Sequence, residues 1–126
     1  MGLCNLGLKA ICGLAGNIDT QTAFGYLAVG TGTTAFSAAQ TTLVAEVSDS
    51  GLSRAAVTPT SEQTTVADDT LQFVKTFSVT GSKTVAEVGT FNAASNGVML
   101  SRYVLGATRS LVNGDTYTLT IKYVFA

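Results

Sequence analysis

The strictest constraint on the fold lies near the end of the chain, where apolar and polar residues alternate from Thr116 to Phe125. Every second side chain there is apolar or aromatic, and the side chains between are Thr or Lys, apart from Val124. A period of two is typical of a β-strand with one buried and one solvated face. The dipeptide Asn113-Gly114 precedes this run, and both residues tolerate the positive φ of a tight turn. We therefore predict an antiparallel strand that is entered from a hairpin.

Shorter apolar runs, separated by turn residues, occupy most of the remaining chain. We expect further strands over residues 24–29, 70–79, 84–92 and 97–105, and an extended segment over residues 52–58. Short strands with turn signals about every ten residues are typical of two packed antiparallel sheets. The sequence thus predicts an all-β fold, an antiparallel and jelly-roll-like β-sandwich. Its expected core contains Phe73, Phe77, Leu119, Ile121 and Tyr123.

The beginning of the chain has the period of a helix. Apolar residues recur at i, i+4, i+7, i+8 and i+11, namely Cys4, Leu8, Ile11, Cys12 and Ala15. This spacing predicts an α-helix that buries one stripe against the sandwich and ends near Gly16-Asn17. We expect a single domain, with the helix in residues 1–16 and the sandwich in residues 24–126. One or two further helical turns are expected within residues 40–47.

Cys4 and Cys12 are the only cysteines. Eight residues along a helix separate them by about 12 Å, which exceeds the reach of a disulfide. We expect both to be apolar core residues in a reducing compartment. The apolar beginning has no basic region before it, and Lys9 interrupts it, so a secretion signal is not expected. No apolar run reaches 18 residues, and we expect no membrane contact.

The composition excludes several classes of function. Charged residues make up 12% of the chain, the net charge is −1 and the pI is about 5.1. A basic surface for nucleic acid is therefore absent. The sequence contains no His, which removes catalytic groups and metal sites that depend on imidazole. We expect no enzymatic activity. A charge-poor surface gives little protection against association, so we expect a homo-oligomer or a symmetric array.

Two motifs are weak candidates for ligand binding. Residues 30–35 read Gly-Thr-Gly-Thr-Thr-Ala, a relaxed dinucleotide fingerprint, but the crossover helix that this motif needs does not follow. Asp68-Asp69 could contribute carboxylates to a cation site, but no third acid lies nearby in the sequence. We interpret both as turns, and no cofactor or metal is expected.

Two ion pairs are more specific predictions. If Asn92 faces Gly97 in the hairpin, Glu87 lies directly opposite Arg102, and both have apolar neighbours on their face. Charges in such a setting are expected to form an ion pair, because a buried unpaired charge costs several kcal/mol. The second candidate pair is Glu46 with Arg54. These four residues are predicted to form structural ion pairs.

The chain resembles small virion proteins of tailed bacteriophages over roughly residues 5 to 125. The resemblance is carried, in order, by residues 26–33, residues 43–46, Arg54, Phe77, residues 87–93, residues 99–102 and Gly114-Asp115. Proteins of this kind include head decoration (cement) proteins and tail-associated proteins. The resemblance implies a β-sandwich with a short helix at the N-terminus, no catalytic residues and no cofactor. The four residues of the predicted ion pairs match recurring charged positions of these proteins.

The leading functional hypothesis is a capsid decoration protein that reinforces the phage head through protein–protein contacts. Its partners would be the major capsid protein or other virion proteins, and it would be located in the virion after synthesis in the host cytoplasm. The alternative is a tail, baseplate or fibre-attachment component. A carbohydrate-binding display domain is a third possibility, carried by Tyr26, Tyr103, Tyr117 and Tyr123 in a chain without Trp.

Overall fold

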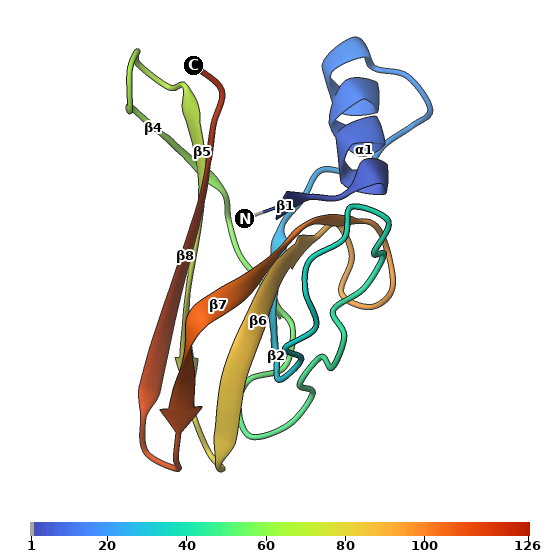
Figure 1. Cartoon of the computed structure of the whole chain (residues 1–126). Coiled ribbons are helices and arrows are strands. Elements are labelled where there is room, and N and C mark those ends of the chain that lie inside the picture. Colours follow the sequence, from blue (N-terminus) through green and yellow to red (C-terminus); the bar gives the residue numbers. More distant parts are fainter. Residues whose placement is uncertain (1) are drawn as a thin grey trace.

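The computed structural model describes residues 2–126, which form two antiparallel sheets and one helix (Figure 1). Sheet A has the strand order β1-β7-β6-β2-β3, and sheet B has the order β4-β5-β8. Sheet A consists of β1 (Gly2–Leu3), β7 (Met99–Leu111), β6 (Lys83–Phe91), β2 (Tyr26–Gly30) and β3 (Ala55–Ala56). Sheet B consists of β4 (Thr60–Glu62), β5 (Thr70–Ser78) and β8 (Thr116–Val124). The all-β prediction is confirmed.

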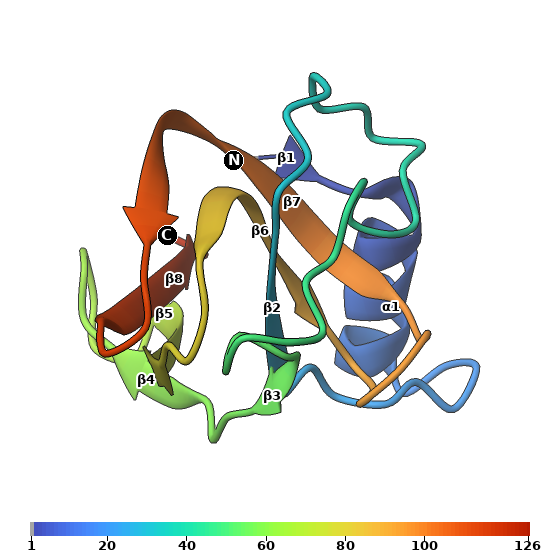
Figure 2. The same ribbon diagram turned by 90° about the horizontal axis from the view of Figure 1, so that it is seen from below.

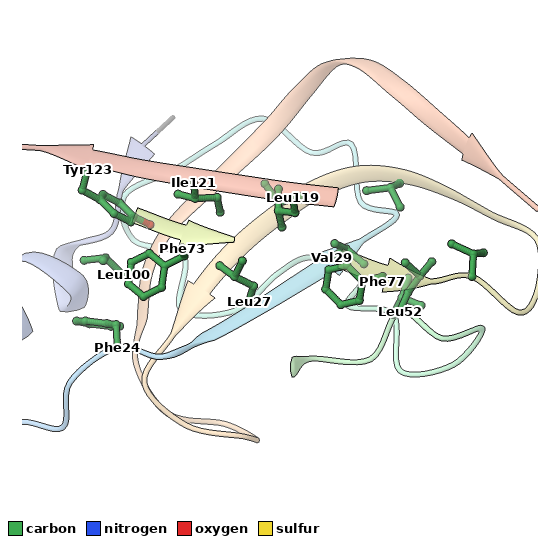
Figure 3. Packing of buried hydrophobic residues seen from close by; sticks show 14 of the residues in the cluster. Phe24, Leu27, Val29, Leu52, Phe73, Phe77, Leu100, Leu119, Ile121 and Tyr123 are labelled. Carbon is green, nitrogen blue, oxygen red and sulfur yellow. The ribbon is translucent and has the colours of Figure 1, made fainter. Parts of the chain in front are cut away.

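The main hydrophobic core lies between the two sheets, as Figure 3 shows. All five side chains predicted for it are buried: Phe73, Phe77, Leu119, Ile121 and Tyr123. The alternation of β8 therefore correctly identified the face that turns inward. Burying one large apolar side chain of this kind contributes about 1.5–3 kcal/mol.

One polar bridge crosses this core. The hydroxyl of Tyr123 on sheet B donates to Oγ1 of Thr90 at 2.8 Å and lies 2.5 Å from Oγ of Ser101, both on sheet A. Burial raises the pKa of this phenol, so it remains protonated and able to donate. Because each of the three hydroxyls has a partner, the bridge avoids the cost of a buried unpaired polar group.

A third layer covers the other face of sheet A. Figure 2 shows α1 (Asn5–Gly16) and an irregular segment, residues 31–54, on the side of sheet A away from sheet B. We call residues 31–54 the covering segment. The helical turns expected within residues 40–47 do not form, because the backbone there bonds elsewhere. The N–H of Val47 donates to the carbonyl of Val29 at 2.9 Å, and Glu46 forms a β-bridge with Gly30.

The helix itself is confirmed, and Asn17 ends it with a left-handed φ of 52°. Its orientation differs from the prediction. The inward side is formed by Gly7, Ala10 and Gly13, whereas Leu8, Cys12 and Ala15 are exposed.

Close approach explains this orientation. A Cβ at Gly7 would lie 2.7 Å from the Cα of Leu100 on β7, so only a side of small residues can pack at this distance. The expectation that both cysteines are core residues is thus right for Cys4 and wrong for Cys12.

Candidate functional site

The four charged residues singled out by the sequence lie where the covering segment meets sheet A. Glu87 on β6 pairs with Arg102 on β7, and Arg54 pairs with Glu46 of the covering segment. The first pair lies within sheet A and the second within the covering segment, and the other hydrogen bonds of each pair connect the covering segment to sheet A or to its hairpin loop. Together they form a charge network between the second and third layers of the fold.

Glu87 accepts four hydrogen bonds, two at each carboxylate oxygen. Its Oε2 accepts from the backbone N–H groups of Gly32 and Ala45, each at 2.8 Å. Its Oε1 accepts from the N–H of Val44 at 2.8 Å and from Nε of Arg102 at 2.7 Å. The carboxylate thus fastens both ends of a loop in the covering segment to the sheet, and its lone pairs are fully used.

Arg102 extends the same network into the covering segment. Its Nη1 donates to the carbonyl of Thr34 at 2.8 Å and to Oε1 of Gln40 at 3.2 Å. The side chains of Arg102 and Glu87 are both 0% exposed, so this ion pair is completely removed from water. Nη2 of Arg102 is also buried and makes no hydrogen bond to the described residues. The pair is therefore well but not perfectly satisfied.

The predicted register of this pair is wrong although the contact is present. Glu87 lies opposite Val104, and Arg102 lies opposite Gly89. On the loop side of Glu87, the strands depart from the simple hairpin register, with an irregularity between Thr90 and Phe91. A second irregularity, between Val85 and Glu87, shifts the register again farther from the loop. The displacement at this position is two residues, which returns each side chain to the same face of the sheet. The carboxylate and the guanidinium therefore meet diagonally rather than directly across.

The same irregularities change which apolar residues lie on the face of sheet A that carries the charges. Strict alternation along the two strands would place Val85 beside Glu87 and Leu100 beside Arg102, but both apolar residues pack into the core between the sheets. A second, smaller apolar cluster includes Cys4, which lies near Arg102, and Phe91, which contacts Arg54; its buried members are Cys4, Ala28, Leu43, Phe91 and Met99.

The second pair fixes the other end of the covering segment. Arg54 donates from Nε and Nη2 to the two carboxylate oxygens of Glu46, at 3.0 and 2.7 Å. Its Nη1 donates to the carbonyls of Ala93 and Asn96, in the loop between β6 and β7. The guanidinium also lies 3.6 Å from the ring centroid of Phe91. One arginine thus connects the covering segment, the hairpin loop and the sheet.

Hydrogen bonding decides the charge state of Glu87. Burial opposes its ionisation, but the bonds from Arg102 and from the N–H groups of Ala45, Val44 and Gly32 outweigh this effect. Together they hold the pKa of the carboxyl below its usual range. An ionised carboxylate is therefore the form that the folded state prefers.

This lowered pKa predicts a loss of stability in acid. Because the folded-state pKa of Glu87 lies below its unfolded value, its contribution is complete above about pH 4.5 and disappears as the pH falls through the folded value. We expect the midpoint of urea unfolding to fall steadily below about pH 4.5.

The control for acid sensitivity is the double variant Glu87→Leu/Arg102→Met, which removes the pair as a unit. Asp69 also has a lowered pKa, because the N–H of Val66 donates to it, and it remains in both proteins. The double variant should therefore lose less stability between neutral and acid pH than the wild type. Equal losses in the two proteins would contradict a stabilising role for ionised Glu87.

The two weak ligand motifs have structural roles in this fold. A Cβ at Gly30 would lie 2.7 Å from the carbonyl oxygen of Ala45 and from Oε2 of Glu87. The glycines of residues 30–35 thus allow the backbone to pass closely over the carboxylate. Asp69 accepts from the N–H groups of Thr64, Thr65 and Val66 at 2.8–2.9 Å and so shapes the turn between β4 and β5.

No group of three or more metal-ligating side chains occurs within residues 2–126. In the same residues, no helix is long and apolar enough to cross a membrane. The polar atoms of the charge network form hydrogen bonds with other groups of the protein. The network thereby holds the covering segment on sheet A. Sequence reasoning found the four charged residues but missed the backbone donors. The glycines before the covering segment were the only signal for them.

Comparison with known proteins gives the family. Residues 13–124 match the family described as Podophage GP4 fiber I protein gp80. The chain belongs to this family. The match confirms the resemblance to virion proteins of tailed phages and makes this chain a phage structural protein related to fibres. No curated protein matches the sequence.

The four charged residues lie within the span matched to the fibre family, whereas most of α1 precedes it. The charge network is therefore part of the region that defines family membership. The larger part of α1 lies outside the matched span.

Proposed function

We propose that this protein is a structural subunit of the phage fibre apparatus and acts through protein–protein contacts, without catalysis or a cofactor. The observation that carries the proposal is the match of residues 13–124 to a fibre protein family. The sequence alone favoured head decoration. The description of the family leads us to place the fibre-associated alternative first.

The physical properties of the molecule support a structural role. A fibre subunit must keep its fold while it contacts other subunits. The covering segment is held at both ends by ion pairs, and the side chains of their two arginines are 0% and 8% exposed. Its charge-poor surface favours association with copies of itself and with other virion proteins. Neither nucleic acid nor a membrane is required by this proposal.

The proposal predicts where the protein occurs and in how many copies. Fibres occupy few positions of high symmetry on a virion, whereas decoration proteins follow the lattice of the shell. Quantitative mass spectrometry of purified virions should therefore give far fewer copies of this protein than of the major capsid protein. Gold-labelled antibody should mark the tail region. A copy number similar to that of the major capsid protein would instead establish head decoration.

A reconstitution experiment tests the absence of a cofactor. Purified protein is added to particles that lack it, with and without a metal chelator. We expect incorporation to be the same in both conditions. Incorporation that stops with chelator would contradict the proposal, and Asp68 and Asp69 would be the first residues to examine.

A further inference from the structure

The outer side of α1 carries an apolar stripe that residues 2–126 leave uncovered. Sequence periodicity predicts a buried stripe containing Leu8, Ile11, Cys12 and Ala15, yet only Ile11 is even half-buried. Leu8 is 48% exposed. The helix contacts the sheet through small residues instead. A stripe with helical spacing that faces away from its own domain is typical of a helix that packs on a partner.

The stripe continues into an apolar hollow between α1 and the end of sheet B. The hollow has a volume of about 440 Å³, and its lining includes Ile11, Leu14 and Ala15 from the helix and Leu71 and Phe125 from the other side. Phe125 is 63% exposed, the largest exposed fraction among the large apolar side chains of the described residues. In Figure 1, α1 and the C-terminus lie at the same end of the molecule. The hollow shares Ile11 and Ala15 with the stripe, so the two apolar surfaces adjoin.

The order of residue sizes along the stripe fits a second copy of the same helix. Antiparallel pairing about a two-fold axis between positions 11 and 12 places Leu8 opposite Ala15 of the second copy, and Ile11 opposite its Cys12. Each large side chain then meets a small one, as helix packing requires.

The few charges of α1 and the low net charge of the chain are compatible with this antiparallel pairing. Lys9 is the only charged residue of α1, so no ion pair is required of the partner. The net charge of −1 also gives two copies little reason to repel each other.

We propose that α1 is a self-association surface, on which α1 of a second copy packs antiparallel along the stripe and over the mouth of the hollow. This inference deepens the proposed function, on which it rests, by naming one contact between subunits. A helix of this length presents on the order of 200 Å², whereas each partner of a stable interface contributes about 800 Å². The dimer interface therefore also includes neighbouring apolar residues such as Leu3 and Phe125. The isolated dimer is expected to be weak.

Cys12 provides a direct test, because the proposed axis passes beside it. Helices packed about 8–10 Å apart leave about 4–5 Å between facing Cα atoms, close to the range that a disulfide spans. Mild oxidation of concentrated protein should give a disulfide-linked dimer that Cys12→Ser abolishes. Cys4 is buried, and burial raises the pKa of its thiol, so it should not react.

The direction of pairing is tested in a Cys12→Ser background. A mixture of the Leu8→Cys and Ala15→Cys variants should form a mixed disulfide, because these positions face each other in the antiparallel arrangement. Cross-linking of the Leu8→Cys variant with itself would indicate parallel helices and would overturn the proposal.

Sedimentation measurements with charge variants complete the test. Leu8→Glu places a charge in the proposed interface and should weaken dimerisation about tenfold or more. Val112→Glu is the matched control, because Val112 is 54% exposed in the turn between β7 and β8. Figure 1 shows this turn at the end of the molecule opposite to α1. Circular dichroism verifies that both variants fold.

The remaining outcomes overturn the proposal. They are protein that stays monomeric at its highest soluble concentration and forms no Cys12 disulfide, dimerisation that survives Leu8→Glu, and protection of Cys12 only by a different virion protein. None of these outcomes bears on copy number or location in the virion, so the proposed function would remain to be judged separately.

Discussion

Replacing Arg102 with alanine is expected to destabilise the fold by about 3–5 kcal/mol, because it leaves a fully buried carboxylate without its positive partner. Glu87 would retain three backbone hydrogen bonds, but its charge would be uncompensated in a site that water does not reach. The loss is measured as the change in free energy of unfolding in urea at neutral pH. It should be accompanied by release of the covering segment, detected as faster hydrogen exchange at Gly32, Val44 and Ala45.

The double variant Glu87→Leu/Arg102→Met separates the cost of a broken pair from the value of an intact one. Buried ion pairs replaced by apolar residues of similar size are often neutral in stability. Nη2 of Arg102 makes no hydrogen bond to the described residues, which lowers the net value of the pair. We therefore expect the double variant to be closer to the wild type than Arg102→Ala. A cost of less than about 1 kcal/mol for Arg102→Ala is the value for an exposed pair, and it would mean that water reaches Glu87 in the folded protein.

The parts of this fold that sequence predicted are those in which local patterning and tertiary burial agree. In β8 the alternation of Leu119, Ile121 and Tyr123 with polar residues left one choice of face, and the structure has that face. Charges on an apolar face likewise had to be paired, so Glu87 and Arg102 could be matched. The exact register of Glu87 and Arg102 could not be predicted, because it depends on irregularities in β6 and β7 that no residue type marks clearly.

The remaining structure could not be predicted because it depends on how closely two elements approach. In α1 the apolar stripe indicated the helix correctly, but the buried side is set by the contact of Gly7 with the backbone of Leu100. Residues 40–47 have the composition of a short helix. They are held irregular by Glu87, which is more than forty positions away in the sequence. Such tertiary contacts override local propensity.

Replacing Phe73 with alanine is the second change with a large expected effect, about 3–5 kcal/mol of lost stability. Phe73 is 0% exposed at the centre of sheet B, directly opposite Ile121 in the β5–β8 pairing. Its ring also meets that of Tyr123 edge to face, with centroids 5.9 Å apart (Figure 3). The alanine variant therefore loses apolar burial and an aromatic contact together, and it leaves a cavity between the sheets.

Phe73→Ala is also expected to weaken the polar bridge formed by Tyr123. Its hydroxyl joins the two sheets through Thr90 and Ser101, and the ring of Phe73 helps hold it in that position. The variant Tyr123→Phe removes only the bridge. Combining it with Phe73→Ala should cost less than the sum of the single changes, because the two residues are in contact.

The matched control is Val74→Ala, one residue further along β5 on the opposite face. Val74 is 44% exposed, so its truncation should change the unfolding free energy by no more than about 0.5 kcal/mol. A cost for Phe73→Ala as small as that of Val74→Ala would mean that β5 is inverted. The same inversion would move the ring of Phe73 away from Tyr123, so the double variant would then show no coupling.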